Sequence, residues 1–368
     1  MRLLITGSNG FVGKNLVVKL GERPGCEIVR FDREHALESL PDKLVQCDAV
    51  VHLAGVNRPQ DPREFDTGNS GLTQSLCEGI AKIGRPLPLI VASSTQAGRD
   101  NPYGRSKRAA ELAAEALAVR TGNPVVVYRL PGIFGKWCRP NYNSVVATFC
   151  HNIASNLPIR VDDPATQLRL VHVDDVVGEF LSSLETPTPG LRMGTVLPQY
   201  ETTLGELASQ IVAFRNCRDN LVVERVGTGF VRALYSTYVS YLPTEQFAYG
   251  LSSHVDPRGT FVEMLKTKDS GQFSFFTAHP GVTRGGHYHH AKTEKFLVIK
   301  GSARFRFRHV LSDERYEIEV SGDHPAVVET IPGWAHDITN TGTDELVVML
   351  WANEIFDRDR PDTIACPV

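Results

Sequence analysis

The segment GSNGFVG, from Gly7 to Gly13, constrains the fold of this chain most strongly. It follows the short apolar run LLIT and opens the run FVGKNLVVKL, so it lies between an expected strand and an expected helix. Glycines at this spacing let the backbone approach a pyrophosphate closely, and a helix amino terminus supplies free amide donors. This context predicts a dinucleotide-binding loop with six contact residues: Gly7, Asn9, Gly10, Phe11, Val12 and Gly13.

Apolar strands and helices continue to alternate until about Gly135. The runs EIVRF, AVVHLAG, LPLIVASS and VVVYRL are typical of strands, and helices are expected around residues 72–82 and from Tyr103 to about Arg120. Strand–helix–strand repetition at this spacing predicts a doubly wound parallel sheet of the Rossmann type. After Pro131 the pattern becomes irregular, which suits a small lobe that binds substrate at the carboxyl ends of the strands.

The character of the sequence changes again after SYLP, which ends at Pro243. Short alternating runs, among them QFSFFTA, KFLVIKG and ELVVMLW, are separated by Gly, Asp and Asn at intervals of roughly ten residues. This spacing predicts an antiparallel sandwich or a small barrel. We therefore expect a boundary within residues 243–250, which divides the chain into an α/β domain, 1–245, and an all-β domain, 246–368.

Composition and charge exclude several classes of protein. The 368 residues carry a formal net charge of −3, which argues against a broad basic surface for nucleic acid or an anionic membrane. The apolar stretches fall short of the ~18 residues of a membrane span, and the first strand begins at Leu3 without a signal sequence before it. We therefore expect a cytoplasmic protein. The seven scattered cysteines form no CxxC pair, which indicates buried thiols.

Two further segments bear on the expected nucleotide. The second strand ends in FDR, where Asp32 would accept from an adenosine ribose hydroxyl and favour NAD, whereas Arg33 would pair with a 2′-phosphate and favour NADP. These two residues indicate opposite cofactors. The third strand ends in HLAG, and its last three residues are expected to pass close to the cofactor: Leu53, Ala54 and Gly55.

The segment SSTQAGRDNPYGRSK carries the chemistry expected of the first domain. Tyr103 and Lys107 lie one helical turn apart on one face, so the ammonium can lower the pKa of the phenol while it holds the nicotinamide ribose. Ser94, at the end of a strand, can hydrogen-bond the same substrate oxygen, and Ser93 and Thr95 are open alternatives. Together these groups provide an acid and a base for hydride transfer at a carbinol or ketone carbon.

The segment RGGHYHHAKTEKFLVIKG indicates a metal site in the second domain. His287 and His289 alternate, so on an extended strand both side chains project to one face, while His290 projects to the other. Glu294 follows at a distance that a turn brings back, and His336 lies in IPGWAHDITN on a later strand. Two or three imidazoles with one carboxylate suit a divalent metal such as zinc and leave a position for water or substrate.

Residues 1–245 resemble the extended short-chain dehydrogenase/reductases that act on nucleotide sugars. The segments GSNGFVG, HLAG, YGRSK, RLPGIFG and HVDDV carry the resemblance. It implies that Tyr103 is the catalytic acid/base, Lys107 its partner and Ser94 the hydroxyl that binds the substrate oxygen. Only eight residues separate Ser94 from Tyr103, fewer than most relatives have.

The second domain resembles two groups that assign different roles to one histidine. The HxH pair, Glu294 and the later PGxxH resemble the cupins, small jelly rolls whose motifs line one metal pocket. VDPRGTFVE with TRGGHYH is similar to the sugar-nucleotide epimerases of the cupin fold, in which the histidine of the RGxH segment is a general base. His287 is therefore either a ligand or the base. In the second case the metal would rest on His289, Glu294 and His336.

The whole chain resembles a group of bifunctional capsule and O-antigen enzymes that make UDP-2-acetamido-2,6-dideoxy-L-talose, on the route to UDP-N-acetyl-L-fucosamine. In that group the cupin epimerises C3 of a 4-keto sugar nucleotide, and the reductase then reduces the C4 ketone with NADPH. The resemblance also implies a UDP-sugar substrate and a homodimer. Candidate substrate contacts are Asn141, Tyr142, Asn143, Arg169 and Arg258. The alternative is a reductase whose cupin is a structural metal clip or dimerisation module.

Overall fold

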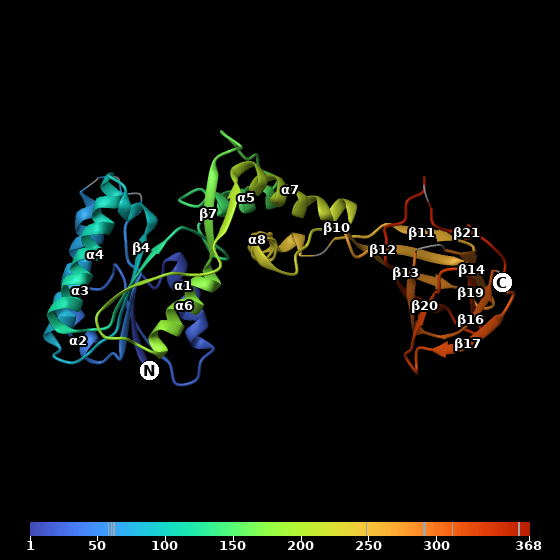
Figure 1. Ribbon diagram of the computed structural model, residues 1–368, viewed down its shortest axis with the longest axis horizontal. Helices are drawn as coiled ribbons and strands as arrows, with labels where there is room; N and C mark the ends of the chain where they lie inside the picture. The colour runs from blue at the N-terminus through green and yellow to red at the C-terminus, as the bar shows by residue number, and fades with distance from the viewer. Residues whose placement is uncertain are drawn as a thin grey trace. The chain divides into compact units, whose positions relative to one another are not determined.

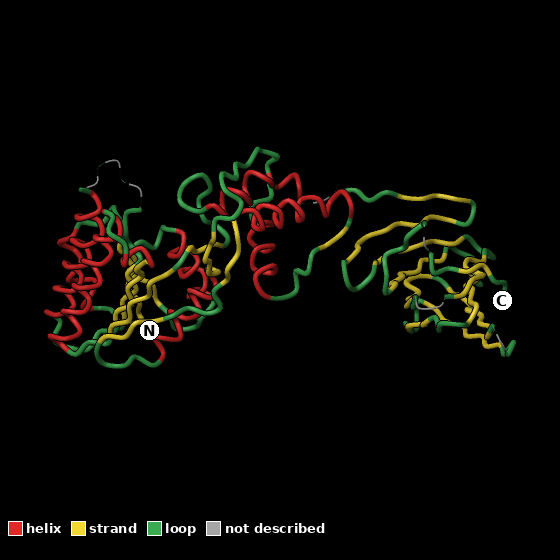
Figure 2. The backbone as a smooth tube through the Cα atoms, turned by 45° about the horizontal axis from the view of Figure 1, so that its top comes forward, coloured by secondary structure: helices red, strands yellow, loops and turns green. Residues whose placement is uncertain are grey.

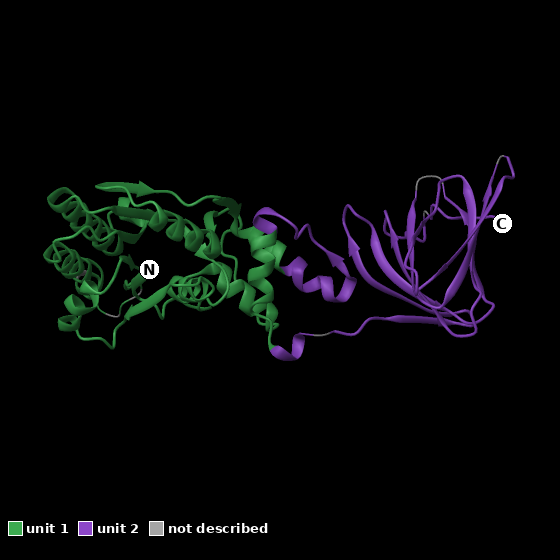
Figure 3. Ribbon diagram, turned by 90° about the horizontal axis from the view of Figure 1, so that it is seen from below, with its two compact units in different colours: residues 1–211, 232–243 green, residues 212–231, 244–368 purple. Residues whose placement is uncertain are grey.

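The computed structural model describes residues 1–57, 59, 61, 63–247, 249–289, 292–310, 312–359 and 361–368. The chain divides into two compact units (Figure 3). The first unit comprises Met1–Ile211 with Arg232–Pro243, and the second comprises Val212–Val231 with Thr244–Val368. The second unit therefore also contains a stretch of the chain that precedes the predicted boundary.

A six-stranded parallel sheet, ordered β2-β1-β3-β4-β5-β8, forms the centre of the first unit (Figure 1). Its strands are β1 (Arg2–Thr6), β2 (Glu27–Phe31), β3 (Ala49–His52), β4 (Leu89–Ser94), β5 (Val125–Leu130) and β8 (Leu191–Gly194). The helical elements between them are α1 (Phe11–Gly21), η1 (Leu37–Ser39), α2 (Leu40–Val45), η2 (Asp66–Gly71), α3 (Leu72–Lys82), η3 (Thr95–Gly98), α4 (Pro102–Thr121) and α6 (Val173–Glu185). This arrangement confirms the predicted doubly wound α/β fold.

The inner strands of this sheet, β1, β3, β4 and β5, are largely buried on both faces because successive side chains enter two different cores. Leu3 and Ile5 of β1 pack in one core with side chains of α1 and α6. Leu4, between them, packs in the other core with side chains of α2, α3 and α4. The near-continuous apolar runs of the sequence thus reflect a sheet covered by helices on both sides.

The irregular sequence after Pro131 folds into a small lobe. A three-stranded sheet runs in the order β6-β7-β9. Its elements are β6 (Gly132–Phe134), β7 (Gln167–His172) and β9 (Tyr200–Thr203). The helices α5 (Val145–Ala154), α7 (Leu204–Asn220) and α8 (Gly229–Val239) and the turn η4 (Thr244–Gln246) complete this region of the chain. The lobe was predicted, but its sheet was not, because β6 and β9 have only three and four residues.

Two sheets, antiparallel except where β10 runs parallel to β12, form most of the second unit, in which strands dominate (Figure 2). One sheet contains β10 (Val222–Val223), β11 (Ser253–Asp256), β12 (Gly259–Thr267), β13 (Gln272–Ala278), β20 (Leu346–Ala352), β15 (Glu294–Lys300) and β18 (Val327–Glu329). The other contains β17 (Arg315–Ser321), β16 (Ser302–His309), β19 (Trp334–Asn340), β14 (Thr283–Tyr288) and β21 (Ile364–Ala365). Side chains from both sheets share one core, as in the contact of Phe296 with Phe305, whose ring centroids lie 5.5 Å apart. The predicted all-β jelly roll is confirmed.

All seven cysteines are free thiols, of which five are buried and two, Cys26 and Cys366, are partly exposed. Burial raises the pKa of Cys47 to about 11 and that of Cys77 to about 12, so these thiols are poor nucleophiles at neutral pH. In the part of the chain that the structure describes, no helix combines the length and apolar character that crossing a membrane requires.

Candidate active sites

The glycine loop of the first unit forms a cradle at the start of α1. Gly7 has a φ of 71°, and a Cβ atom there would lie 2.7 Å from the backbone nitrogen of Ala54. A Cβ atom at Gly13 would lie 2.3 Å from the carbonyl oxygen of Gly7. Helix α1 begins after Gly10 without a side-chain cap, so its first amides are available to an anion. This backbone fits a dinucleotide pyrophosphate.

The turn after β3 lies against this loop. Thr6 Oγ1 accepts hydrogen bonds from the backbone N–H groups of Leu53 and Ala54, at 3.2 and 3.1 Å. Gly55 lies beside the catalytic candidate Lys107, because a Cβ atom at Gly55 would come within 3.2 Å of Lys107 Nζ. The structure therefore brings the predicted cofactor residues of this turn next to those of the loop, whose Phe11 and Val12 open α1.

Asp32 points to the glycine loop. Its Oδ2 accepts a hydrogen bond from the hydroxyl of Ser8 at 2.5 Å, and its Oδ1 accepts one from the backbone N–H of Asn9 at 3.4 Å. Arg33 is exposed. The carboxylate is thus already used within the loop, whereas the neighbouring guanidinium is accessible from solvent. The sequence analysis did not single out Ser8, although a hydroxyl within a glycine-rich loop could have indicated a contact with the residue that follows the second strand.

The side chains of Tyr103, in the first turn of α4, and Ser94, the last residue of β4, face each other. Asn101 caps this helix by accepting a hydrogen bond from the backbone N–H of Gly104 at 2.8 Å, which fixes the first turn that carries Tyr103. Burial raises the pKa of the Tyr103 phenol, and a hydrogen bond with Ser94 opposes that rise. Among the three hydroxyls considered, Ser94 is therefore the one beside the phenol.

Lys107 is held by the sheet. Its Nζ donates a hydrogen bond to the carbonyl oxygen of Ala92 at 3.1 Å. Burial lowers the pKa of Lys107 to about 8, and the carboxylate of Glu111 opposes this shift. The expected lowering of the Tyr103 pKa by Lys107 is not seen. The desolvation of the phenol has the larger effect, and the ammonium is turned to a backbone carbonyl.

Sequence reasoning missed a buried carboxylate behind this pair. Glu111, on α4, is 3% exposed. Its Oε1 accepts hydrogen bonds from Ser93 Oγ at 2.6 Å and from Arg129 Nε at 2.8 Å, and its Oε2 accepts from Arg129 Nη2 at 2.6 Å and from Arg108 Nη1 at 3.0 Å. Ser93 thus ties the end of β4 to α4, and its neighbour Ser94 is left to face Tyr103. The spacing of Glu111, one turn after Lys107, was the available signal.

The candidate substrate residues of the first unit lie at its surface. Asn141, Tyr142 and Asn143 are exposed in the loop before α5, where the guanidinium of Arg139 lies 5.3 Å from the ring centroid of Tyr142. Arg169 is exposed on β7. Arg258 belongs to the second unit and binds the carboxylate of Asp256 in the turn after β11. That pairing lowers the pKa of Asp256 to about 2.

The predicted metal ligands of the second unit come together. His287 on β14, His289 just after it, Glu294 at the start of β15 and His336 on β19 place their donor atoms within 4.8 Å of one another. His289, Glu294 and His336 are at most 5% exposed, and His287 is half-buried. His290 lies outside the described residues. Burial, with His336 as the next cause, lowers the pKa of His287 to about 4.

Glu294 forms the centre of this cluster. Its Oε2 lies 3.1 Å from His289 Nε2 and 3.4 Å from His336 Nε2, the latter without the geometry of a hydrogen bond. Burial alone would raise the pKa of Glu294, but contacts with the two imidazoles and with Lys292 lower it. His336 Nε2 is thus a buried donor atom without a hydrogen-bond partner, directed at an ionised carboxylate. Such a set fits a divalent metal ion.

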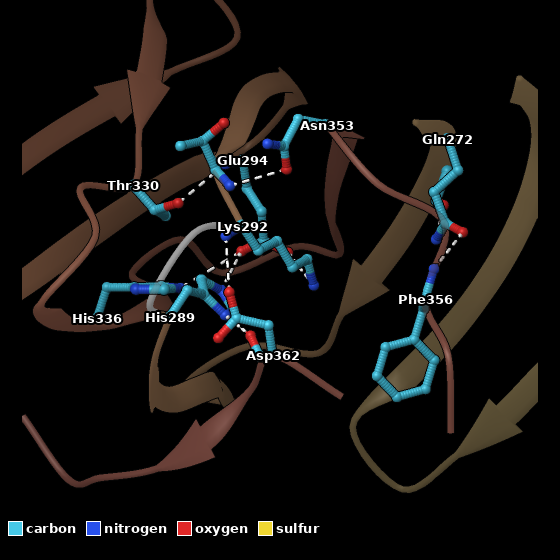
Figure 4. A network of polar contacts seen from close by, with 11 residues as sticks. Gln272, His289, Lys292, Glu294, Thr330, His336, Asn353, Phe356 and Asp362 are labelled. Carbon is cyan, nitrogen blue, oxygen red and sulfur yellow. Dashed lines mark hydrogen bonds and ion pairs between the residues drawn. The ribbon is translucent and has the colours of Figure 1, made fainter. Parts of the chain in front are cut away.

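Two residues that the sequence did not single out surround the cluster (Figure 4). Lys292 Nζ lies 3.0 Å from Glu294 Oε1. The backbone carbonyl of Asp362 lies 2.5 Å from His289 Nδ1, and Asp362 Oδ2 accepts a hydrogen bond from the backbone N–H of Lys292 at 2.8 Å. The contact with Asp362 identifies Nδ1 as the protonated nitrogen of His289, which leaves Nε2 for a metal.

The sequence matches two protein-family models. Residues 3–194 match the NAD dependent epimerase/dehydratase family, and residues 254–364 match the polysaccharide biosynthesis C-terminal domain. The chain belongs to the NAD dependent epimerase/dehydratase family. The cradle and Tyr103 lie in the first matched segment, and the histidine cluster lies in the second.

Full-length relatives share both segments. The chain is 57% identical to UDP-2-acetamido-2,6-beta-L-arabino-hexul-4-ose reductase of Pseudomonas aeruginosa, covering 100% of this chain and 99% of that protein. It matches a crystal structure of the capsular polysaccharide assembling protein CapF from Staphylococcus aureus with a TM-score of 0.92 and 42% identity, covering 100% of both chains. These relatives confirm the predicted resemblance. A structure of MoeE5 with UDP-glucuronic acid and NAD shares the family fold at 24% identity and a TM-score of 0.53, covering 58% of this chain and 82% of that one.

Proposed function

We propose that this member of the family is a bifunctional nucleotide-sugar enzyme. Its second unit epimerises C3 of a UDP-2-acetamido-2,6-dideoxy-4-hexulose, and its first unit reduces the C4 ketone with NADPH to UDP-2-acetamido-2,6-dideoxy-L-talose, for capsule or O-antigen. The name of the 57% identical relative supports a 4-keto sugar nucleotide as substrate. The observation that carries the proposal is the pairing of Tyr103 with Ser94 in one unit and a buried donor cluster in the other. We also propose a cytoplasmic homodimer.

For the reduction, Tyr103 is the proton donor. The raised pKa of the phenol keeps it protonated at neutral pH, so it can transfer its proton to the C4 oxygen as the carbonyl becomes an alcohol. Ser94 positions that oxygen, and the ammonium of Lys107 lies where the cofactor ribose is expected. Bound NADPH would supply the hydride. NADPH rather than NADH is supported by Arg33, which is exposed while Asp32 is engaged in the loop.

For the epimerisation, four side chains would hold a divalent metal, in the first instance zinc: His287, His289, Glu294 and His336. A bound metal would supply positive charge that polarises the C4 carbonyl and makes the C3 proton more acidic. We assign His287 to the metal, so the base that takes the C3 proton and the acid that returns a proton to the opposite face of the enolate are groups outside this set of four. The ring centroid of His287 lies 4.8 Å from that of His336 and 5.0 Å from that of His289, within the reach of one ion.

A second candidate function for the cluster is purely structural. The burial of His289, Glu294 and His336 favours it, because closed structural metal sites exclude solvent. In that case the protein would only reduce a ketone that another enzyme has prepared.

One incubation tests both proposals. The protein is mixed with NADPH and a UDP-4-keto-6-deoxy-N-acetylhexosamine in deuterated water, and the product is identified by NMR. Deuterium at C3 together with the L-talo product is expected. A reduced product with a retained C3 proton would refute the epimerase and leave the structural role. No oxidation of NADPH would refute the reductase.

A further inference from the structure

Glu294 presents its two oxygens to different partners. Its Oε2 faces the imidazole nitrogens of His289 and His336, at 3.1 and 3.4 Å. Its Oε1 is paired with the ammonium of Lys292 at 3.0 Å (Figure 4). The side chains of Lys292 and Glu294 are only 10% and 6% exposed. One carboxylate is therefore shared between an internal cation and the place where an ion would bind.

The position of Lys292 is set by contacts around it. Its backbone N–H donates to Asp362 Oδ2 at 2.8 Å, and its Nζ lies 5.8 Å from the ring centroid of Phe356. The backbone N–H of Glu294 donates to Thr330 Oγ1 at 3.0 Å, which fixes the other end of the pair. A lysine held in this way differs from a surface lysine, whose ion pairs contribute little because both side chains move.

We infer that Lys292 is a positioning residue that reserves Glu294 Oε1, so that the carboxylate offers only Oε2 to a metal. The inference rests on the proposed metal centre. It assigns to Lys292 two effects of a fixed positive charge. Without metal, the ammonium compensates a carboxylate that would otherwise be buried with an unpaired charge. With metal, the same charge weakens binding, and it leaves the ion more electron-withdrawing because Glu294 donates through one oxygen.

Three full-length variants test this assignment. Lys292→Met removes both the charge and the hydrogen bond, whereas Lys292→Gln can still donate a hydrogen bond to Oε1 without the charge. Lys295→Met is the matched control, because Lys295 lies three residues further on, with a half-exposed side chain paired to Glu329. The affinity for Zn²⁺ is measured by competition with a chelator. The coordination is read from the visible absorption of bound Co²⁺.

We expect both Lys292 variants to bind Zn²⁺ about tenfold more tightly than the wild type, and the control to match the wild type within about twofold. In Lys292→Met the freed Oε1 becomes a second donor, so the Co²⁺ bands should weaken as the coordination number rises. Lys292→Gln should keep the wild-type spectrum, and its affinity decides the question if Lys292→Met does not fold.

Three outcomes would overturn the inference. Unchanged or weaker Zn²⁺ binding in both Lys292 variants, with a wild type that binds Zn²⁺, would refute the role of Lys292 alone and leave the proposed metal centre intact. An equal gain in Lys295→Met would show a general charge effect. A wild type that binds neither Zn²⁺ nor Co²⁺ would remove the metal centre and the inference with it.

Discussion

The two units each bury a lysine at their candidate site, but they surround it differently. In the first unit, Lys107 Nζ donates to a neutral carbonyl, that of Ala92. The nearby carboxylate of Glu111 is already occupied by Arg129, Arg108 and Ser93. In the second unit, Lys292 faces the carboxylate of Glu294 directly at 3.0 Å.

This difference separates two uses of a buried ammonium. Without a full opposite charge in contact, burial brings the pKa of Lys107 to about 8, so its charge can change near neutral pH. Lys292 instead pairs directly with the carboxylate of Glu294 inside the second unit. The first unit is thus suited to moving a proton, and the second to holding a charged centre.

The largest expected effect is a loss of ketone reduction without any loss of exchange at C3. Tyr103→Phe removes the proton donor but retains the ring that contacts Phe65, at a centroid distance of 5.7 Å. We expect NADPH oxidation to fall about 10³-fold, while deuterium exchange at C3 continues at the wild-type rate. NADPH absorbance and NMR measure the two steps. Loss of C3 exchange in this variant would mean that both steps use one site.

Metal removal should act on the second unit alone. A bound ion at about a thousandfold its dissociation constant stabilises the folded state by about 4 kcal/mol, so chelation should lower the free energy of unfolding of that unit by a similar amount. Hydrogen–deuterium exchange should increase in peptides from β14, β15 and β19 and stay unchanged in β1 and β4. Faster exchange in β1 and β4 would contradict the independence of the two sites.

The proximity of the residues in the first candidate site could be predicted from the sequence because its parts are local. The loop from Gly7 to Gly13 and the pair Tyr103 and Lys107 each lie within a few residues, and their spacing alone determines which backbone and side chains meet. The sequence could not rank Ser93 against Ser94. The two point to opposite faces of β4, and only the position of Glu111 decides which one faces Tyr103.

For the second candidate site, the sequence predicted which four side chains come together but not what surrounds them. Histidines and a glutamate at characteristic spacing indicate a metal wherever the strands place them. Lys292 and Asp362 carry no such signal, because they are 70 residues apart and meet where the carboxyl-terminal segment returns to pair its strand β21 with β14. Contacts of this range depend on the register of strands, which no local pattern encodes.

A third cation at a candidate site, Arg33, is exposed, unlike the two buried lysines. Arg33 follows Asp32, whose carboxylate contacts the glycine loop, and under the proposed function it pairs with the 2′-phosphate of NADPH. Arg33→Ala should raise KM for NADPH about tenfold and leave KM for NADH unchanged, since one charge-assisted contact is lost. Steady-state kinetics with both cofactors measure the ratio, and Arg120→Ala, which removes an exposed arginine from the last turn of α4, is the control. An equal rise for both cofactors would remove Arg33 from cofactor discrimination.

The smallest expected effect follows from replacing Glu111, whose carboxylate does not contact Lys107 directly. Lys107 is protonated below its pKa of about 8, so a reduction that needs the ammonium should lose rate as pH rises through about 8. Glu111 opposes the lowering of that pKa, and Glu111→Gln should move this falling limb to lower pH and reduce the rate at pH 8 several-fold. The variant also breaks the pair with Arg129, so it should unfold at a lower temperature.

Glu115→Gln makes the same charge change one turn further along α4 and should leave the falling limb of the pH profile in place. A limb that stays near pH 8 in Glu111→Gln, despite the lost stability, would show that Glu111 only braces β4 against α4. The lowered pKa of Lys107 would then be set by burial alone, and Glu111 would have no part in the contrast between the two lysines.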